Sequence, residues 1–134
     1  MNKTTIGNLL TAMHGEAFAY AKYMLYAERA RQNGNTELAQ LFENTAREER
    51  LEHFAEEAEL AGLVGTDADN LKDAILGESY EVETMYREFA QRAADVGDLA
   101  ASDRFAEIRH DETKHRDAFK AALAKLTANS SRAA

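Results

Sequence analysis

Acidic side chains occupy positions in this chain where an amphipathic helix normally buries an apolar one. The clearest stripe, at helical spacings of three and four, runs through Phe105, Ile108, Glu112, His115, Phe119, Ala122 and Leu126. An unpaired carboxylate is very costly in an apolar core, so such a group survives there by pairing or by binding a metal. Glu112 and His115 form a Glu-x-x-His pair. With comparable glutamates elsewhere, this pair predicts a carboxylate-bridged two-metal site inside a four-helix bundle.

The composition indicates an all-helical fold. The 134 residues include no proline, seven glycines and 45% hydrophobic residues, which favours one all-α domain spanning residues 1–134. Glycines and capping residues divide it into expected helices at about 5–32, 36–61, 67–96 and 98–127, followed by a tail at 128–134 that we expect to fray.

Charge and cysteine content exclude several classes of function. A net charge of −8 argues against nucleic acid and anionic membranes as main partners. The absence of cysteine excludes disulfides, thiolate zinc sites, iron–sulfur clusters and cysteine nucleophiles. The first residues lack the apolar run of a signal peptide, and no segment reaches transmembrane length, so we expect a cytoplasmic protein.

The two halves of the sequence resemble each other. Gly15-Glu16 and Gly77-Glu78 lie equally deep in the first and third expected helices. Phe42 precedes Glu49 by seven residues, as Phe105 precedes Glu112. Two similar helical hairpins predict a pseudo-twofold bundle in which each half supplies a similar set of ligands.

The linker between the halves constrains how they can pair. If both hairpins of one chain packed as in ferritin, the second and third helices would run parallel, and the linker would have to span about 37 Å. The five residues of 62–66 reach at most about 18 Å. The bundle is therefore either a simple up-down-up-down one or a dimer in which hairpins are exchanged, and the likeness of the halves favours the exchanged dimer.

The recurring ligand set for two metals is one Glu from each of two helices and Glu-x-x-His from each of the other two. Glu16 and Glu78 fit the single positions, and Glu112 with His115 fits one pair. Carboxylates suit the site because each can bridge two cations and offset their charge.

The second expected helix leaves one ligand open. Glu49 is followed by Glu52 three residues later and by His53 four residues later, and both positions lie near the face of Glu49. Either could be the terminal ligand. Glu81 lies three residues after Glu78 and could add a further carboxylate. Later in the second expected helix, we expect Glu56, Glu57 and Glu59 to face solvent.

A family resemblance rests on several motifs together: Gly15-Glu16, Gly77-Glu78-x-x-Glu81, Met85-Tyr86 and Glu112-x-x-His115. In this combination the chain, except for its tail, resembles the rubrerythrin family. The resemblance implies a ferritin-like four-helix bundle, two iron ions at the predicted ligands, and reduction of hydrogen peroxide to water in oxidative-stress defence. It also implies that Glu81 exchanges with a histidine of the second helix when iron changes oxidation state, although here Glu52 stands three residues after Glu49.

Further roles follow from the same resemblance. Tyr23 and Tyr86 match family tyrosines near the iron, whose hydroxyls could hydrogen-bond a ligand carboxylate or peroxide; packing as core aromatics is the other interpretation. Without cysteines the chain resembles the short, rubredoxin-free branch, so electrons would come from a separate, rubredoxin-like donor. Manganese in place of iron, a ferroxidase or iron-handling role, an oxygenase and a metal-free helical interaction module are the alternatives.

Overall fold

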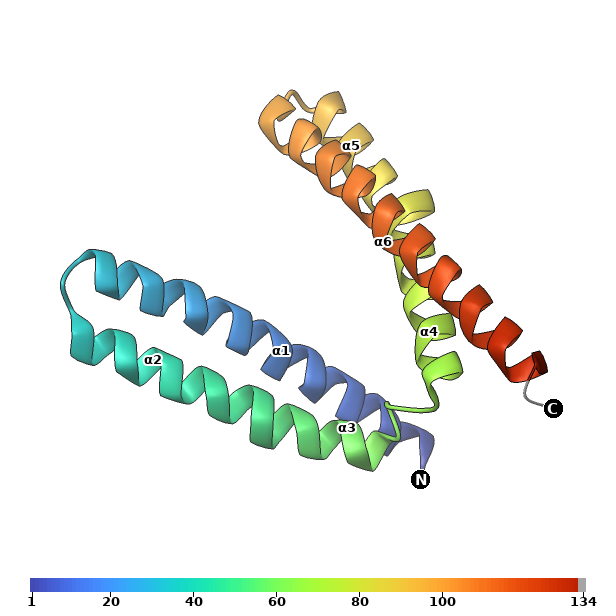
Figure 1. Cartoon of the computed structure of the whole chain (residues 1–134). Coiled ribbons are helices and arrows are strands. Elements are labelled where there is room, and N and C mark those ends of the chain that lie inside the picture. Colours follow the sequence, from blue (N-terminus) through green and yellow to red (C-terminus); the bar gives the residue numbers. More distant parts are fainter. Residues whose placement is uncertain (133–134) are drawn as a thin grey trace. The chain divides into compact units, whose positions relative to one another are not determined.

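The computed structural model describes residues 1–132, and the side chains of residues 1–128. Throughout this range the ordered elements are helices, with no strand, so the predicted all-α class is confirmed. The chain divides into two compact units, Met1–Val64 and Gly65–Ala134, each of which is a helical hairpin (Figure 1). The prediction of a single domain stays a prediction.

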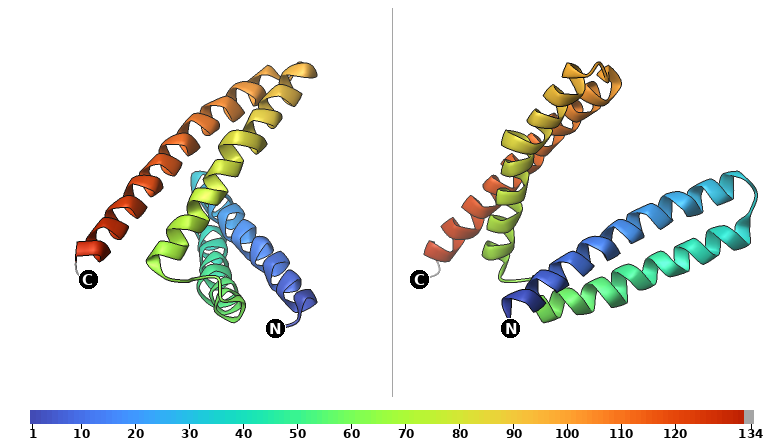
Figure 2. Two further views of the ribbon diagram at one scale, coloured as in Figure 1. Left: turned by 90° about the vertical axis from the view of Figure 1, so that its right-hand side faces the viewer. Right: turned by 180° about the vertical axis from the view of Figure 1, so that it is seen from behind.

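The first hairpin pairs α1 (Lys3–Gln32) with a second long helix made of α2 (Thr36–Glu48), η1 (Glu49–Phe54) and α3 (Ala55–Ala61). The segment η1 is π-helical, and the residues on either side of it keep helical backbone angles, so the second helix is continuous. Two further views show the two helices side by side along their length (Figure 2).

The second hairpin begins with α4 (Asp67–Tyr80), the π-helical segment η2 (Glu81–Met85) and α5 (Tyr86–Asp95), which together form one continuous helix. It returns through α6 (Leu99–Arg132). The last helix thus continues five residues past its expected end at 127, into the expected tail, while positions 133 and 134 lie outside the described residues.

Local sequence signals explain where the helices begin and end. The side chains of Asn35 and Thr66 accept hydrogen bonds from backbone N–H groups in the first turns of α2 and α4, as N-caps do. The turns at Gly34, Gly62 and Gly97 have φ values of 76°, 66° and 84°, which glycine adopts at little cost. The turns at Gly34 and Gly97 allow the two helices of each hairpin to run antiparallel, whereas Gly62 ends the second helix of the first hairpin.

Matching aromatic clusters support the predicted likeness of the halves. In the first hairpin the rings of Tyr23, Tyr26 and Phe42 contact one another in tilted or edge-to-face pairs, with ring centroids 5.4–6.3 Å apart. In the second, equivalent places are filled by Tyr86, Phe89 and Phe105, with centroids 5.6–6.4 Å apart.

Each hairpin also leaves apolar surface uncovered. Large side chains exposed by more than half include Phe18, Leu25, Leu41, Leu76 and Leu99. A hairpin of two helices cannot enclose its whole apolar stripe. No helix among the described residues has the length and apolar character needed to cross a membrane.

Candidate metal centre

The first hairpin brings together Glu16 from α1 with Glu49 and His53 from η1. One ligand atom of each lies within 4.8 Å of the others, and His53 Nδ1 lies 2.8 Å from Glu49 Oε2. Two carboxylates and an imidazole converging in this way can bind a divalent transition metal.

The second hairpin holds an equivalent group, Glu78 from α4 with Glu112 and His115 from α6. His115 Nδ1 lies 2.7 Å from Glu112 Oε2 and 3.9 Å from Glu78 Oε1. We call the two groups the first and second triads. Each combines a glutamate from one helix with a glutamate–histidine pair from the other.

The carboxylates of each triad repel one another. A hydrogen bond with Glu49 is the main cause of the raised pKa of Glu16. Burial, followed by the hydrogen bond with Glu112, raises the pKa of Glu78. A bound cation would offset the negative charge of the paired carboxylates, the same charge that raises these pKa values.

Unsatisfied acceptors also fit a metal. Glu78 Oε2 is buried and has no hydrogen-bond partner, although buried polar atoms are rarely left unpaired. Glu81 lies at the start of η2, and burial raises its pKa, with Glu112 as the next cause. Six residues, Glu16, Glu49, His53, Glu78, Glu112 and His115, could therefore hold metal, with Glu81 beside the second triad.

The π-helical segment η1 bears on the open choice between Glu52 and His53. A π-turn contains one more residue than an α-turn, so a histidine four residues after Glu49 takes the place that a regular helix gives to a residue three later. His115, three residues after Glu112 on the α-helical α6, is its counterpart. Glu52 is exposed and is not part of the triad. The geometry thus favours His53.

The π-helical segment η2 likewise compensates for an extra residue, here between a ligand glutamate and a tyrosine. Tyr23 follows Glu16 by seven residues on the regular α1, whereas Tyr86 follows Glu78 by eight, with η2 between them. The extra residue is absorbed by η2, so both tyrosines reach equivalent aromatic clusters, where Tyr23 contacts Phe42 at 6.0 Å and Tyr86 contacts Phe105 at 6.2 Å between ring centroids.

The tyrosine hydroxyls make no hydrogen bond to any of the described residues, so their role at the site stays a prediction. Burial raises the pKa of Tyr86, with Glu81 as the next cause. The Tyr86 hydroxyl therefore holds its proton firmly near the second triad.

One acidic residue differs from its expected environment. Glu57 is half-buried, and its Oε2 is buried without a partner, whereas a solvated side chain was expected. Its charge also contributes to raising the pKa of Glu16. The signal in the sequence is its position four residues after His53, on the same helical face.

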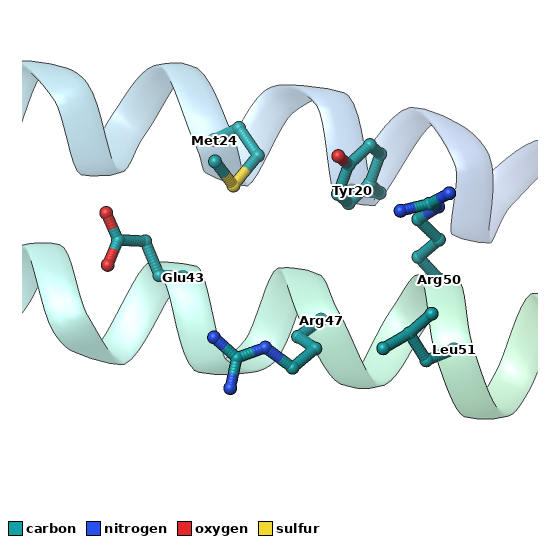
Figure 3. Close-up of a pocket in the computed structure, with 6 residues that line it drawn as sticks. All are labelled: Tyr20, Met24, Glu43, Arg47, Arg50 and Leu51. Carbon is teal, nitrogen blue, oxygen red and sulfur yellow. The ribbon is translucent and has the colours of Figure 1, made fainter.

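A surface hollow of about 260 Å³ lies in the groove between α1 and the second helix of the first hairpin (Figure 3). Its lining residues are Tyr20, Met24, Glu43, Arg47, Arg50 and Leu51. The Arg50 guanidinium lies 5.7 Å from the centre of the Tyr20 ring, a cation–π contact. The hollow contains no triad residue and is separate from the candidate metal centre.

The comparisons with known proteins agree with this geometry. The family model described as rubrerythrin matches residues 7–55 and 49–123. The chain belongs to the rubrerythrin family. A putative rubrerythrin of Methanocaldococcus jannaschii is 32% identical over 92% of this chain and 71% of its own. The rubrerythrin of Porphyromonas gingivalis is 32% identical over 94% of this chain and 72% of its own length.

Nigerythrin of Nitratidesulfovibrio vulgaris is 31% identical over 93% of this chain and 68% of its own. A solved structure of nigerythrin, in the fully reduced, all-ferrous state, is 30% identical and has a TM-score of 0.48, covering 96% of this chain and 70% of that one.

The resemblance inferred from the sequence motifs is thus confirmed. As a rubrerythrin, the protein has the ferritin-like helical fold class and belongs to a family of iron-binding oxidoreductases concerned with oxidative stress. The exchanged dimer stays a prediction.

Proposed function

We propose that this member of the rubrerythrin family is a diiron peroxidase that reduces hydrogen peroxide to water. The observation that carries the proposal is the pair of matched triads, one in each hairpin, which between them offer four carboxylates and two imidazoles. That donor set is the one that carboxylate-bridged di-iron proteins assemble from four helices.

Either triad alone has too few ligands for two metals, so the complete site would combine one triad of each kind. We favour hairpins exchanged between two chains, because the five-residue linker at 62–66 is too short for a ferritin-like crossover within one chain. The exposed apolar side chains of each hairpin give such an exchange a physical reason, since a second hairpin would cover them.

Two ferrous ions bound by this set would supply the two electrons that, with two protons, convert one hydrogen peroxide into two water molecules. The chain's own groups would manage the protons. The Glu81 carboxyl, whose pKa is raised by burial, can hold a proton beside the second triad. The Tyr86 hydroxyl, also with a raised pKa, can donate a hydrogen bond to peroxide without losing its proton.

The protein would need a reductant after each turnover. The 134 residues contain no cysteine, so they hold no thiolate-bound iron that could pass electrons to the site. We propose that electrons come from a separate rubredoxin-like protein.

The first test is iron content after anaerobic loading with ferrous iron and desalting. About two irons per chain are expected, with much less in Glu16→Gln and Glu112→Gln, and no loss in the exposed control Glu56→Gln. A wild-type protein that retains no iron would overturn the proposal.

The second test compares oxidants. Reduced, loaded protein is mixed with hydrogen peroxide or with O2 in a stopped-flow instrument, and the oxidation of iron is followed by absorbance. Oxidation at least tenfold faster by peroxide supports a peroxidase. The reverse order would favour a ferroxidase or iron-handling protein instead.

A further inference from the structure

The π-helical segment η2 releases a backbone carbonyl in the second hairpin. The Tyr86 N–H donates to the carbonyl of Glu81, five residues earlier. In a regular α-helix it would donate to Val82, four residues earlier. The Val82 carbonyl therefore loses its usual partner, and Val82 is one of the buried residues of the hairpin. A buried carbonyl requires another donor.

Arg109 supplies that donor from the facing helix. Its Nε donates to the Val82 carbonyl oxygen at 2.7 Å, in a part-buried position that joins α6 to η2. Among the described residues, Arg109 forms no ion pair with a carboxylate. The guanidinium is thus directed at the backbone of η2, and a charged donor makes this a strong hydrogen bond.

The matched half of the chain lacks this arrangement. Arg109 precedes Glu112 by three residues, and the residue three before Glu49 is Ala46, which is fully buried. The helix facing Ala46 is α1, which is α-helical throughout. An arginine therefore stands at this position only where the facing helix contains a π-helical segment.

The direction of the ligands depends on η2 remaining π-helical. If the segment reverted to α-helix, the part of the helix before it would turn by about 100° relative to the part after it. Glu78 and the aromatic cluster around Tyr86 could then no longer both face α6. We propose that Arg109 is a positioning residue that keeps η2 π-helical and so directs Glu78 and Glu81 toward Glu112 and His115. The link to iron rests on the proposed function.

Hydrogen exchange of the metal-free protein tests whether the hydrogen bond from Arg109 to the Val82 carbonyl stabilises η2. Arg109→Met keeps an unbranched side chain that reaches about as far as Nε and removes the donor, and amides of residues 81–86 should exchange about tenfold faster. Arg109→Lys, which keeps the charge, should give a smaller increase. Ser102→Ala is the matched control, because Ser102 Oγ also donates across the hairpin, to the Ala90 carbonyl at 2.9 Å, but on the regular α5.

Ferrous-iron affinity, measured by competition with a chelator, tests the positioning role. Arg109→Met should weaken binding about tenfold or more, and Ser102→Ala should not. Unchanged exchange at 81–86 in Arg109→Met, an equal increase in Ser102→Ala, or wild-type iron affinity in Arg109→Met would each overturn the inference. A wild-type protein that binds no iron would instead overturn the proposed function. The hydrogen-exchange experiment would still show whether Arg109 stabilises η2.

Discussion

Glutamates that lie side by side in each triad are a local cost of this structure. The pKa of Glu16 is raised mainly by its hydrogen bond with Glu49, and that of Glu78 by partial burial and then by its hydrogen bond with Glu112. The same closeness that destabilises the metal-free charges is what lets two carboxylates bind one cation. Such a placement of glutamates is typical of a binding site and not of a helix optimised for stability.

The pH dependence of stability should reflect this cost. A carboxyl whose folded pKa lies above its ordinary value of 4.5 binds protons more tightly in the folded state. Its contribution to stability is complete below pH 4.5 and is lost as the pH rises through the raised pKa. Glu78→Gln should therefore stabilise the metal-free protein at pH 7 by about 0.5–1 kcal/mol. The free energy of unfolding of this variant should also fall less steeply above pH 4.5 than that of the wild type.

Urea unfolding of the chelator-treated protein at several pH values measures this change. Asp73→Asn, on an exposed residue of α4 that forms no ion pair with any described residue, is the control and should follow the wild type. A Glu78→Gln variant that is less stable than the wild type at pH 7 would contradict the interpretation of Glu78 as one member of a repelling pair.

The choice of ligand on the second helix is also a question about single residues. His53→Ala should weaken iron binding at least tenfold, because its imidazole lies in the first triad. Glu52→Gln should bind iron as the wild type does, since Glu52 is part of neither triad. Chelator competition on both variants decides between them, and the opposite pattern would make Glu52 the ligand.

At the scale of the helices, the two π-helical segments reconcile unequal spacings. The Glu49–His53 pair is one residue longer than Glu112–His115, and both of its residues lie within η1. The η2 segment likewise lies between Glu78 and Tyr86. A single extra residue would rotate every following side chain by about 100° in an α-helix, so each π-turn preserves the face on which the ligands lie.

Deleting one residue from η2 tests whether the π-turn absorbs a single extra residue. Removal of the exposed Glu83 would place Tyr86 seven residues after Glu78, the spacing of Glu16 and Tyr23 on the regular α1, so the segment should become α-helical with Glu78 and the aromatic cluster still facing α6. The variant should keep its helical circular dichroism and at least half of its iron, whereas removal of the exposed Ala17 from α1, which has no π-turn to lose, should cost at least half of the iron or lower the melting temperature. Glu83→Ala is the control, and equal losses of iron in the two deletion variants would refute the argument.

At the scale of the whole molecule, the chain consists of two hairpins with one triad each. Hairpins of this kind, with large apolar side chains exposed, need a partner to cover them. The proposed exchange between two chains makes a prediction that does not depend on the reaction chemistry.

Complementation between inactive variants tests the exchange. Glu16→Ala damages only the first hairpin, and Glu112→Ala only the second. In an exchanged dimer of the two variants, one site combines both damaged hairpins and the other combines both intact ones, so mixing after unfolding and refolding should restore about a quarter of the wild-type iron, from half of the dimers. If each chain built its own site, no mixture would recover iron above the level of the separate variants.

The sequence by itself determined the helices, the turns and most of the ligand positions. Helix periodicity, caps and turn glycines such as Gly34 and Gly62 act over a few residues, so local signals suffice to place Glu16, Glu78, Glu112 and His115 on helical faces. The family motifs extended that interpretation to iron chemistry, and the comparisons confirmed the family.

Only the tertiary structure decided the register within the helices. A π-turn gives up regular backbone hydrogen bonds, and contacts from a facing helix stabilise it, as the Arg109 bond to Val82 does in η2. No short-range pattern in the sequence encodes that compensation. For the same reason the preference for His53 over Glu52, and the buried oxygen of Glu57, emerged only when the two helices of a hairpin were placed together.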